Sequence, residues 1–133
     1  MSLYETFSTD LAAETDGVWI PFGEGTRVKV RRFQSKPVQM VQQRLQKPYA
    51  GLVRGGQSLP DDIAEKITIR LIAEAVIVDW EGVTDREGNI LPNTTEAKVQ
   101  VLTDLPDFRN AVASAAMERE VFKAQSDEES AKN

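Results

Sequence analysis

Apolar side chains recur at helical spacing through the middle of the chain. Between residues 59 and 80, Ile63, Ile67, Leu71 and Ala75 stand four positions apart, and residues at this spacing lie on one face of an α-helix. The pattern predicts a helix over residues 59–80 that forms the centre of the core. β-Branched residues are frequent enough here to admit a strand as well, but the helical spacing favours the helix.

Residues that commonly start helices stand before each of the apolar stretches. The pairs are Ser35 with Pro37, Ser58 with Asp61, Asn93 with Glu96, and Asp104 with Pro106. Together with the apolar spacing, they predict further helices over residues 36–47, 94–103 and 105–124.

A different periodicity precedes these helices. Two β-prone runs, residues 18–22 and 27–33, flank a short loop with two glycines, which suits a β-hairpin over residues 17–33. In the second run, valines alternate with basic residues, so one face should be apolar and the other wet and basic. Pro21 indicates that the first run is an edge strand or contains a bulge.

These elements predict a mainly α fold with a small N-terminal β-hairpin, an α+β domain of about four helices. At 133 residues the chain has the size of one domain. We expect a polar N-terminal arm over residues 1–16, one domain over residues 17–124, and a disordered tail over residues 125–133, where apolar residues are almost absent.

Composition narrows the chemistry. The chain has neither cysteine nor histidine, so it has no disulfide framework and no thiolate or imidazole for a metal or for nucleophilic catalysis. The sequence predicts a protein that is not an enzyme and uses no cofactor. It has no signal peptide pattern and no apolar run of about 20 residues, which indicates a soluble intracellular protein.

Charge is distributed unevenly. Residues 27–54 hold eight basic residues and no acid, although the net charge of the chain is −5. Such asymmetry indicates either a face that meets an acidic partner or an attraction between the two parts of the chain. The candidate partner-binding residues are Arg27, Lys29, Arg31, Arg32, Lys36, Arg44 and Lys47. A basic face that is only solvated, with no partner, is a further interpretation. Nucleic acid is a weaker candidate, because few aromatic residues lie among these bases and no helix suited to reading base edges is evident.

Residues 78–91 contain an acidic, glycine-bearing turn that could be a cation site, a catalytic carboxylate cluster or only a connection. Aligned as an EF-hand loop on Gly88, the turn places Val83 at position one, which needs an oxygen ligand, and Thr94 at position twelve, which needs a bidentate Glu, so the calcium pattern fails. We interpret the turn as structural, joining two packed helices without binding metal. Its defining residues are Trp80, Gly82, Asp85 and Gly88.

The order of these pieces resembles the tail assembly chaperones of long-tailed, lambda-like (siphovirus-type) bacteriophages. In that family a Gly-x-Trp run precedes a basic strand, as in residues 17–33 here. A helix ending in Trp, a G-V-x-D-x-x-G turn, a proline with a Thr-started helix, and L-P-D opening the last helix then follow. The matching positions are Trp80, Gly82, Val83, Asp85, Gly88, Pro92, Thr94, Thr95, Leu105, Pro106 and Asp107.

The resemblance implies a non-catalytic protein of the infected or lysogenic host cytoplasm, missing from the mature virion. It implies a role in binding the tape measure protein, keeping it soluble, and recruiting tail tube protein, with self-association possible and no membrane contact. Two alternatives stay open: a structural minor tail or head–tail connector protein of the virion, and a small nucleic-acid-binding regulator.

Overall fold

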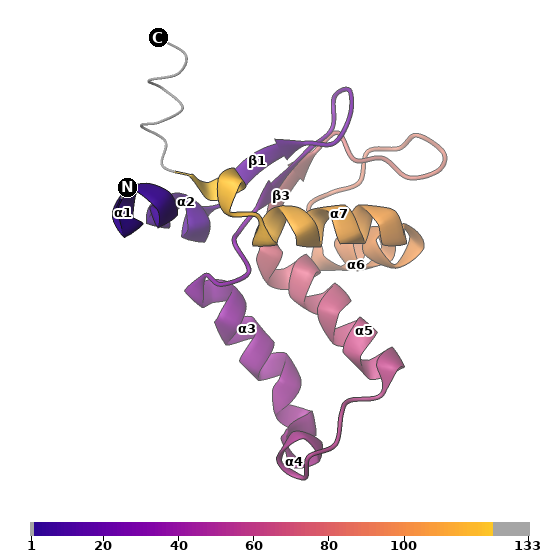
Figure 1. Ribbon diagram of the computed structural model, residues 1–133. Helices are drawn as coiled ribbons and strands as arrows, with labels where there is room; N and C mark the ends of the chain where they lie inside the picture. The colour runs from indigo at the N-terminus through magenta and orange to yellow at the C-terminus, as the bar shows by residue number, and fades with distance from the viewer. Residues whose placement is uncertain (1, 124–133) are drawn as a thin grey trace.

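The structure, a computed structural model, describes residues 2–123 (Figure 1). A three-stranded antiparallel sheet of order β1-β2-β3 packs against a mainly helical body. The predicted fold class, mainly α with a small N-terminal β element, is confirmed. The predicted disordered tail over residues 125–133 lies outside the described residues.

The predicted hairpin is present as β1 (Val18–Pro21) and β2 (Arg27–Val30), paired from Val18 with Val30 to Pro21 with Arg27. Val28 and Val30 are fully buried and Arg27 is exposed, as the alternating pattern requires. Pro21 ends an edge strand, where a missing N–H leaves no ladder bond unmade.

The sheet also has a third strand, β3 (Ile77–Glu81), which begins inside the segment predicted as one helix over residues 59–80. That prediction is wrong beyond its middle. Helix α5 spans Asp61–Leu71, a π-helical segment continues over Ile72–Val76, and the chain then enters β3 directly. Pairing with β2, including Val28 opposite Trp80, supplies the backbone hydrogen bonds that the helix would otherwise make.

The other helices stand close to their predicted places. Helix α3 spans Lys36–Gln46 and continues through a 3₁₀ turn, η1 (Lys47–Tyr49), into the short α4 (Ala50–Arg54). Helices α3 and α5 run antiparallel and extend away from the sheet, with α4 at their far end (Figure 1). Within residues 2–123, no helix combines the length and apolar character that crossing a membrane requires.

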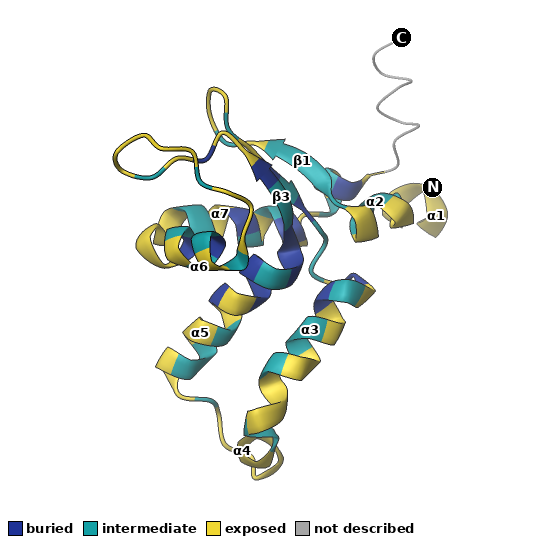
Figure 2. Ribbon diagram, turned by 180° about the vertical axis from the view of Figure 1, so that it is seen from behind, coloured by how far each residue is buried: buried dark blue, intermediate teal, exposed yellow. Residues whose placement is uncertain are grey.

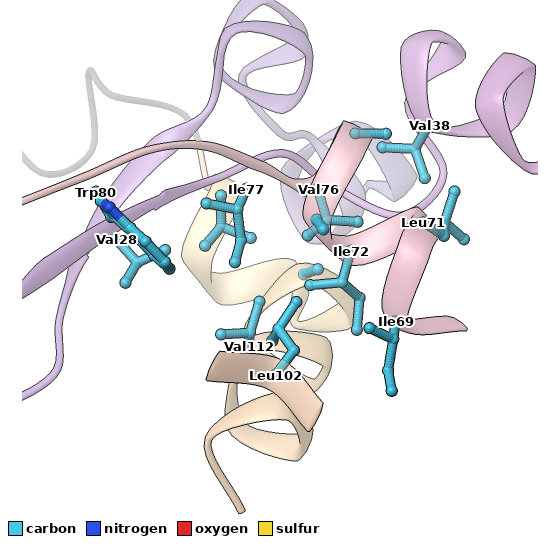
Figure 3. Packing of buried hydrophobic residues seen from close by; sticks show 14 of the residues in the cluster. Val28, Val38, Ile69, Leu71, Ile72, Val76, Ile77, Trp80, Leu102 and Val112 are labelled. Carbon is cyan, nitrogen blue, oxygen red and sulfur yellow. The ribbon is translucent and has the colours of Figure 1, made fainter. Parts of the chain in front are cut away.

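Helix α6 spans Thr95–Asp104 and α7 spans Pro106–Met117, followed by a 3₁₀ turn, η3 (Arg119–Phe122). The last predicted helix, residues 105–124, is therefore too long, because Glu118 is extended. Leu102 of α6 and Val112 of α7 face Ile72 in the core (Figure 3). Buried residues gather where the sheet, α6, α7 and the end of α5 meet (Figure 2).

The N-terminal arm contains two short helices, α1 (Leu3–Phe7) and α2 (Leu11–Asp16). The backbone N–H of Asp10 donates to the carbonyl of Phe122 at 2.8 Å, which ties the arm to η3. The Leu3, Tyr4, Phe7 and Leu11 side chains are nevertheless exposed.

Three of the predicted caps are wrong. Helix α5 starts after Pro60 without a side-chain cap, so Ser58 and Asp61 form no capping box. Thr94, not Asn93, caps α6 by accepting from the N–H of Ala97. Leu105 occupies the cap position of α7 in place of Asp104. The fourth cap is confirmed in position: Ser35 is the N-cap residue of α3 and Pro37 lies in its first turn, but the Ser35 hydroxyl donates to the carbonyl of Arg32 and makes no cap hydrogen bond.

Candidate functional site

The acidic turn connects β3 to α6, so the expectation that it joins two packed helices is wrong. The Asp85 carboxylate accepts hydrogen bonds from the N–H groups of Glu87 and Asn89, both at 2.9 Å. These bonds, led by the one from Asn89, lower the pKa of Asp85. Gly88 has a φ of 87°, the left-handed region that the turn requires. The carboxylate is therefore used to shape the loop itself.

Trp80 and Gly82 fix the base of this loop. The indole N–H of Trp80 donates to the carbonyl of Leu91 at 3.2 Å, and the Trp80 side chain is buried. A side chain on Gly82 would place its Cβ 1.8 Å from the carbonyl oxygen of Gly25 in the β1–β2 loop. The hydroxyl of Thr26 also donates to the Gly82 carbonyl at 3.0 Å. The β1–β2 and β3–α6 loops are therefore held against each other.

These two loops, one face of α6 and the start of α7 enclose a groove of about 760 Å³, which we call the loop groove. Both loops project from the same end of the sheet (Figure 1). Its apolar lining residues are Phe22, Val83, Leu91, Ala97, Val101, Leu105 and Phe108. The rings of Phe22 and Phe108 meet edge to face with centroids 5.2 Å apart, which joins the hairpin to α7 at the groove.

The charged lining residues of the loop groove are mostly acidic. Four carboxylates, those of Asp85, Glu87, Asp104 and Asp107, accompany one guanidinium, that of Arg86. Asp104 and Asp107 stand where α6 gives way to α7, and Asp85 and Glu87 stand on the β3–α6 loop. The groove therefore has an apolar lining with negative charge on two sides.

The predicted basic residues are spread over several elements and partly paired within the chain. Arg27 forms a two-pronged ion pair with Glu81, at 2.7 and 3.0 Å, and its guanidinium lies 4.0 Å from the Trp19 ring centroid. Their hydrogen bond raises the pKa of Arg27 and lowers that of Glu81. Lys29 lies opposite Asp79 in the sheet, 6.0 Å from the ring of Trp19.

Arg31 and Arg32 are structural contacts. Arg31 donates to the carbonyls of Thr15, at 2.6 Å, and Ala75, at 3.1 Å. Arg32 pairs with Glu14 at 2.8 Å, and both side chains are largely buried. These bonds connect the arm and the helix-to-strand transition to the end of β2.

The remaining three candidates lie on or just after α3. Arg44 pairs with Glu74, while Lys36 and Lys47 are exposed. Acidic residues of the same molecule therefore pair with much of the basic run, residues 27–54. This geometry favours the reading in which the two parts attract each other.

A second hollow, of about 420 Å³, lies between the end of β2, α3 and the end of α7. Its lining residues are Arg32, Phe33, Gln34, Gln39, Gln42 and Met117. The Nε atom of Arg32 is buried and finds no hydrogen-bond partner among residues 2–123. Because the Arg32 guanidinium is already paired with Glu14, this hollow is a weaker candidate for a binding site than the loop groove.

The sequence alone does not predict the loop groove. Its apolar lining comes from segments far apart in the chain, and only apolar residues beside the loops, such as Phe22 and Leu91, could have indicated it. Among residues 2–123, no group of three or more acidic, histidine or cysteine side chains could hold a metal ion. The groove offers shape and charge for binding.

Comparison with known proteins adds one finding. A family model described as "YdaY prophage protein" matches residues 33–133, which include α3 to α7 and most of the groove lining. No curated protein and no solved structure matches the chain.

Proposed function

Since this chain belongs to the YdaY prophage protein family, and is therefore a phage or prophage protein, we propose that it is a tail assembly chaperone. It binds the tape measure protein in the cytoplasm of the bacterial host, keeps it soluble, and promotes assembly of the tail tube around it. The role is non-catalytic and needs no cofactor.

The loop groove is the observation that carries this proposal. A chaperone that keeps a helical client soluble must offer apolar surface that the client can enter and leave. The groove provides such surface, and Leu105 at its edge is 51% exposed. Its four carboxylates repel the same groove on a second copy, which limits self-association while the groove is empty.

Several of the residues behind the resemblance to tail assembly chaperones lie at this groove. Gly82, Asp85, Leu105 and Asp107 line it, and Trp80 holds the loop that forms one side. These positions come from two separate stretches of the sequence, residues 80–85 and 105–107, and the fold brings both stretches to one groove. This convergence supports a shared role for the motif and the groove.

Co-expression with the tape measure protein of the same prophage tests the proposal. We expect the tape measure protein to be insoluble when it is expressed alone. When it is expressed together with this chain, it should be soluble and should co-purify with the chain. An insoluble tape measure protein in both cases would overturn the proposal. Tail tube protein should be added to the complex in a second step, because the tube forms around the tape measure.

The protein composition of purified virions distinguishes an assembly chaperone from the alternative, a structural minor tail or head–tail connector protein. Mass spectrometry of purified virions should not find this chain if it acts only during assembly. Its presence at a fixed number of copies per particle would favour the structural role.

A contribution of the basic run to tape measure binding stays a prediction. Its test needs basic residues whose substitution does not disturb the fold. Reversing Arg31 and Arg32 would break the bonds to Ala75 and Glu14 and disturb the fold. The exposed Lys36 and Lys47 are the better choice. If the basic run binds the client, a Lys36→Glu, Lys47→Glu variant should retain less tape measure protein; unchanged retention would exclude these two positions.

A further inference from the structure

We propose that the loop groove binds an amphipathic helix whose apolar stripe is flanked on both sides by lysine or arginine. The inference rests on the proposed function and specifies which segment of the client is recognised.

The apolar lining suits the stripe of a helix. Phe22, Val83, Leu91, Val101 and Phe108 belong to the hairpin loop, the β3–α6 loop, α6 and α7, and each is buried or partly buried. They present carbon surface from several directions around one open space. Helices that bind in grooves insert side chains spaced three, four and seven positions apart into such surfaces.

Several polar groups at the groove are already used within the chain. The hydroxyl of Thr26 donates to the Gly82 carbonyl, the amide of Gln100 donates to Asp104, and Asp85 accepts from its own loop. A small polar ligand needs a few free polar groups that converge on it. The lining therefore favours an apolar surface over a polar metabolite.

The carboxylates define the flanks of the occupant. Asp104 and Asp107 lie on the helix side of the groove, and Asp85 and Glu87 lie on the loop side. A helix seated between them would bring its two flanks close to negative charge. Lysine or arginine there would be attracted, and glutamate or aspartate would be repelled.

Residues 2–123 do not themselves supply this occupant. Its own basic helix is α3, whose apolar residues Val38, Val41 and Leu45 pack into the core of the same molecule. Arg44 of that helix is paired with Glu74. A second copy would have to unfold this packing before α3 could enter the groove, so the occupant belongs to a different protein.

Two synthetic helical peptides of about 18 residues, or five turns, test the inference. Both carry the same leucine stripe; one has lysine on its flanks and the other has glutamate. Fluorescence anisotropy of the labelled peptides measures binding to the full chain. We expect the lysine peptide to bind and to weaken with added salt, and the glutamate peptide to bind at least about tenfold more weakly. Equal binding of the two peptides would overturn the inference.

Matched variants locate the binding site. Leu105→Ser removes an exposed apolar contact in the groove, and Leu11→Ser removes an exposed leucine from the distant arm. Asp104→Asn with Asp107→Asn neutralises the helix side, and Asp61→Asn with Asp62→Asn removes the same charge from α5. Both groove variants should weaken lysine-peptide binding by about tenfold or more, and the controls should not. Groove variants that bind like the wild type would place the site elsewhere and overturn the inference.

The same variants separate this inference from the proposed function. Tape measure protein that co-purifies equally with groove and control variants would overturn the groove inference and leave the chaperone function standing. Lysine peptide bound in the groove, with no retention of tape measure protein, would support the inference and overturn the proposed client.

Discussion

The ammonium group of Lys98 on α6 donates a hydrogen bond of 3.0 Å to the carbonyl oxygen of Ile77, the first residue of β3. Neighbouring carbonyls at the same transition accept from Arg31: its guanidinium bonds to Ala75 and its backbone N–H to Val76. Where helix gives way to strand, carbonyls lose their helical donors, and a buried carbonyl needs another one. Two basic side chains from elsewhere in the chain meet this need.

Replacement of Lys98 by methionine should therefore destabilise the protein. Lys98 is 6% exposed, and methionine keeps much of its buried volume while leaving the Ile77 carbonyl without this donor. We expect the free energy of unfolding to fall by about 1–3 kcal/mol, measured by urea denaturation at neutral pH. Lys66→Met on the exposed face of α5 is the control and should change stability by less than about 0.5 kcal/mol. Equal effects of the two substitutions would remove the role assigned to Lys98.

Lys98 should also make stability depend on alkaline pH. Burial lowers its pKa below the ordinary 10.5, against an opposing effect of Asp79. Below the folded-state pKa, Lys98 is protonated in both the folded and the unfolded protein, and the free-energy cost of burying its charge is fully present. As pH rises toward 10.5 the folded state releases its proton first, so this cost is relieved and stability increases.

The measurement is the difference in free energy of unfolding between the wild type and Lys98→Met. This difference should grow as pH rises from neutral toward 10.5, because other groups titrate equally in both proteins. A constant difference over this range would show that Lys98 has the same pKa in both states.

The contact between the two loops predicts a contrast between two glycines. Gly82 and Gly88 both have positive φ, 74° and 87°, but only at Gly82 would a Cβ meet backbone, the carbonyl of Gly25. Gly88→Ala should cost about 1–2 kcal/mol from backbone conformation alone. Gly82→Ala should cost more than about 4 kcal/mol, because the loops must separate. Thermal unfolding of both variants measures this, and similar losses would mean that the loops separate easily.

The Asp85 turn predicts a pH dependence on the acid side. Hydrogen bonds from Asn89 and Glu87 hold the pKa of Asp85 below its usual 3.8. Their stabilising contribution is present above pH 3.8 and is lost as pH falls through the lower, folded-state value.

Asp85→Asn should therefore be less stable than the wild type at pH 7, with a difference that narrows below pH 3.8. Urea denaturation at several pH values measures this difference. Glu87→Gln removes a neighbouring charge from the same loop and leaves these hydrogen bonds in place. The stability difference between Glu87→Gln and the wild type should therefore change little with pH. A pH dependence equal to that of Asp85→Asn would mean that the net charge of the loop, and not the hydrogen bonds of Asp85, causes it.

The sequence predicts the elements of this fold better than the way they join. The alternation of Val28 and Val30 with basic residues locates β2, and helical spacing locates α5 as far as Leu71. Beyond Leu71, the segment from Ile72 to Ile77 is buried at almost every position, so it shows neither period. Pairing with β2, a contact between residues about fifty positions apart, decides that β3 is a strand.

The candidate site could be predicted even less from the sequence. Asp85 and Gly88 form a turn that local composition indicates, because their conformation depends on neighbours in sequence. The loop groove depends on the approach of Gly82 to Gly25 and of Phe22 to Phe108, which only the tertiary structure determines. The pairing of Arg32 with Glu14 has the same origin: both charges are visible in the sequence, but their contact is not.

The direct passage from α5 through the π-helical segment into β3 has a consequence for how the molecule gains and loses its structure. One unbroken backbone segment belongs to both the helical body and the sheet, without an intervening hinge at which the two could part. Heating should therefore abolish far-ultraviolet helicity and change the fluorescence of the two tryptophans, Trp19 and Trp80, at a single midpoint. Proteases, for the same reason, should find no cleavable connection at the centre of the intact molecule.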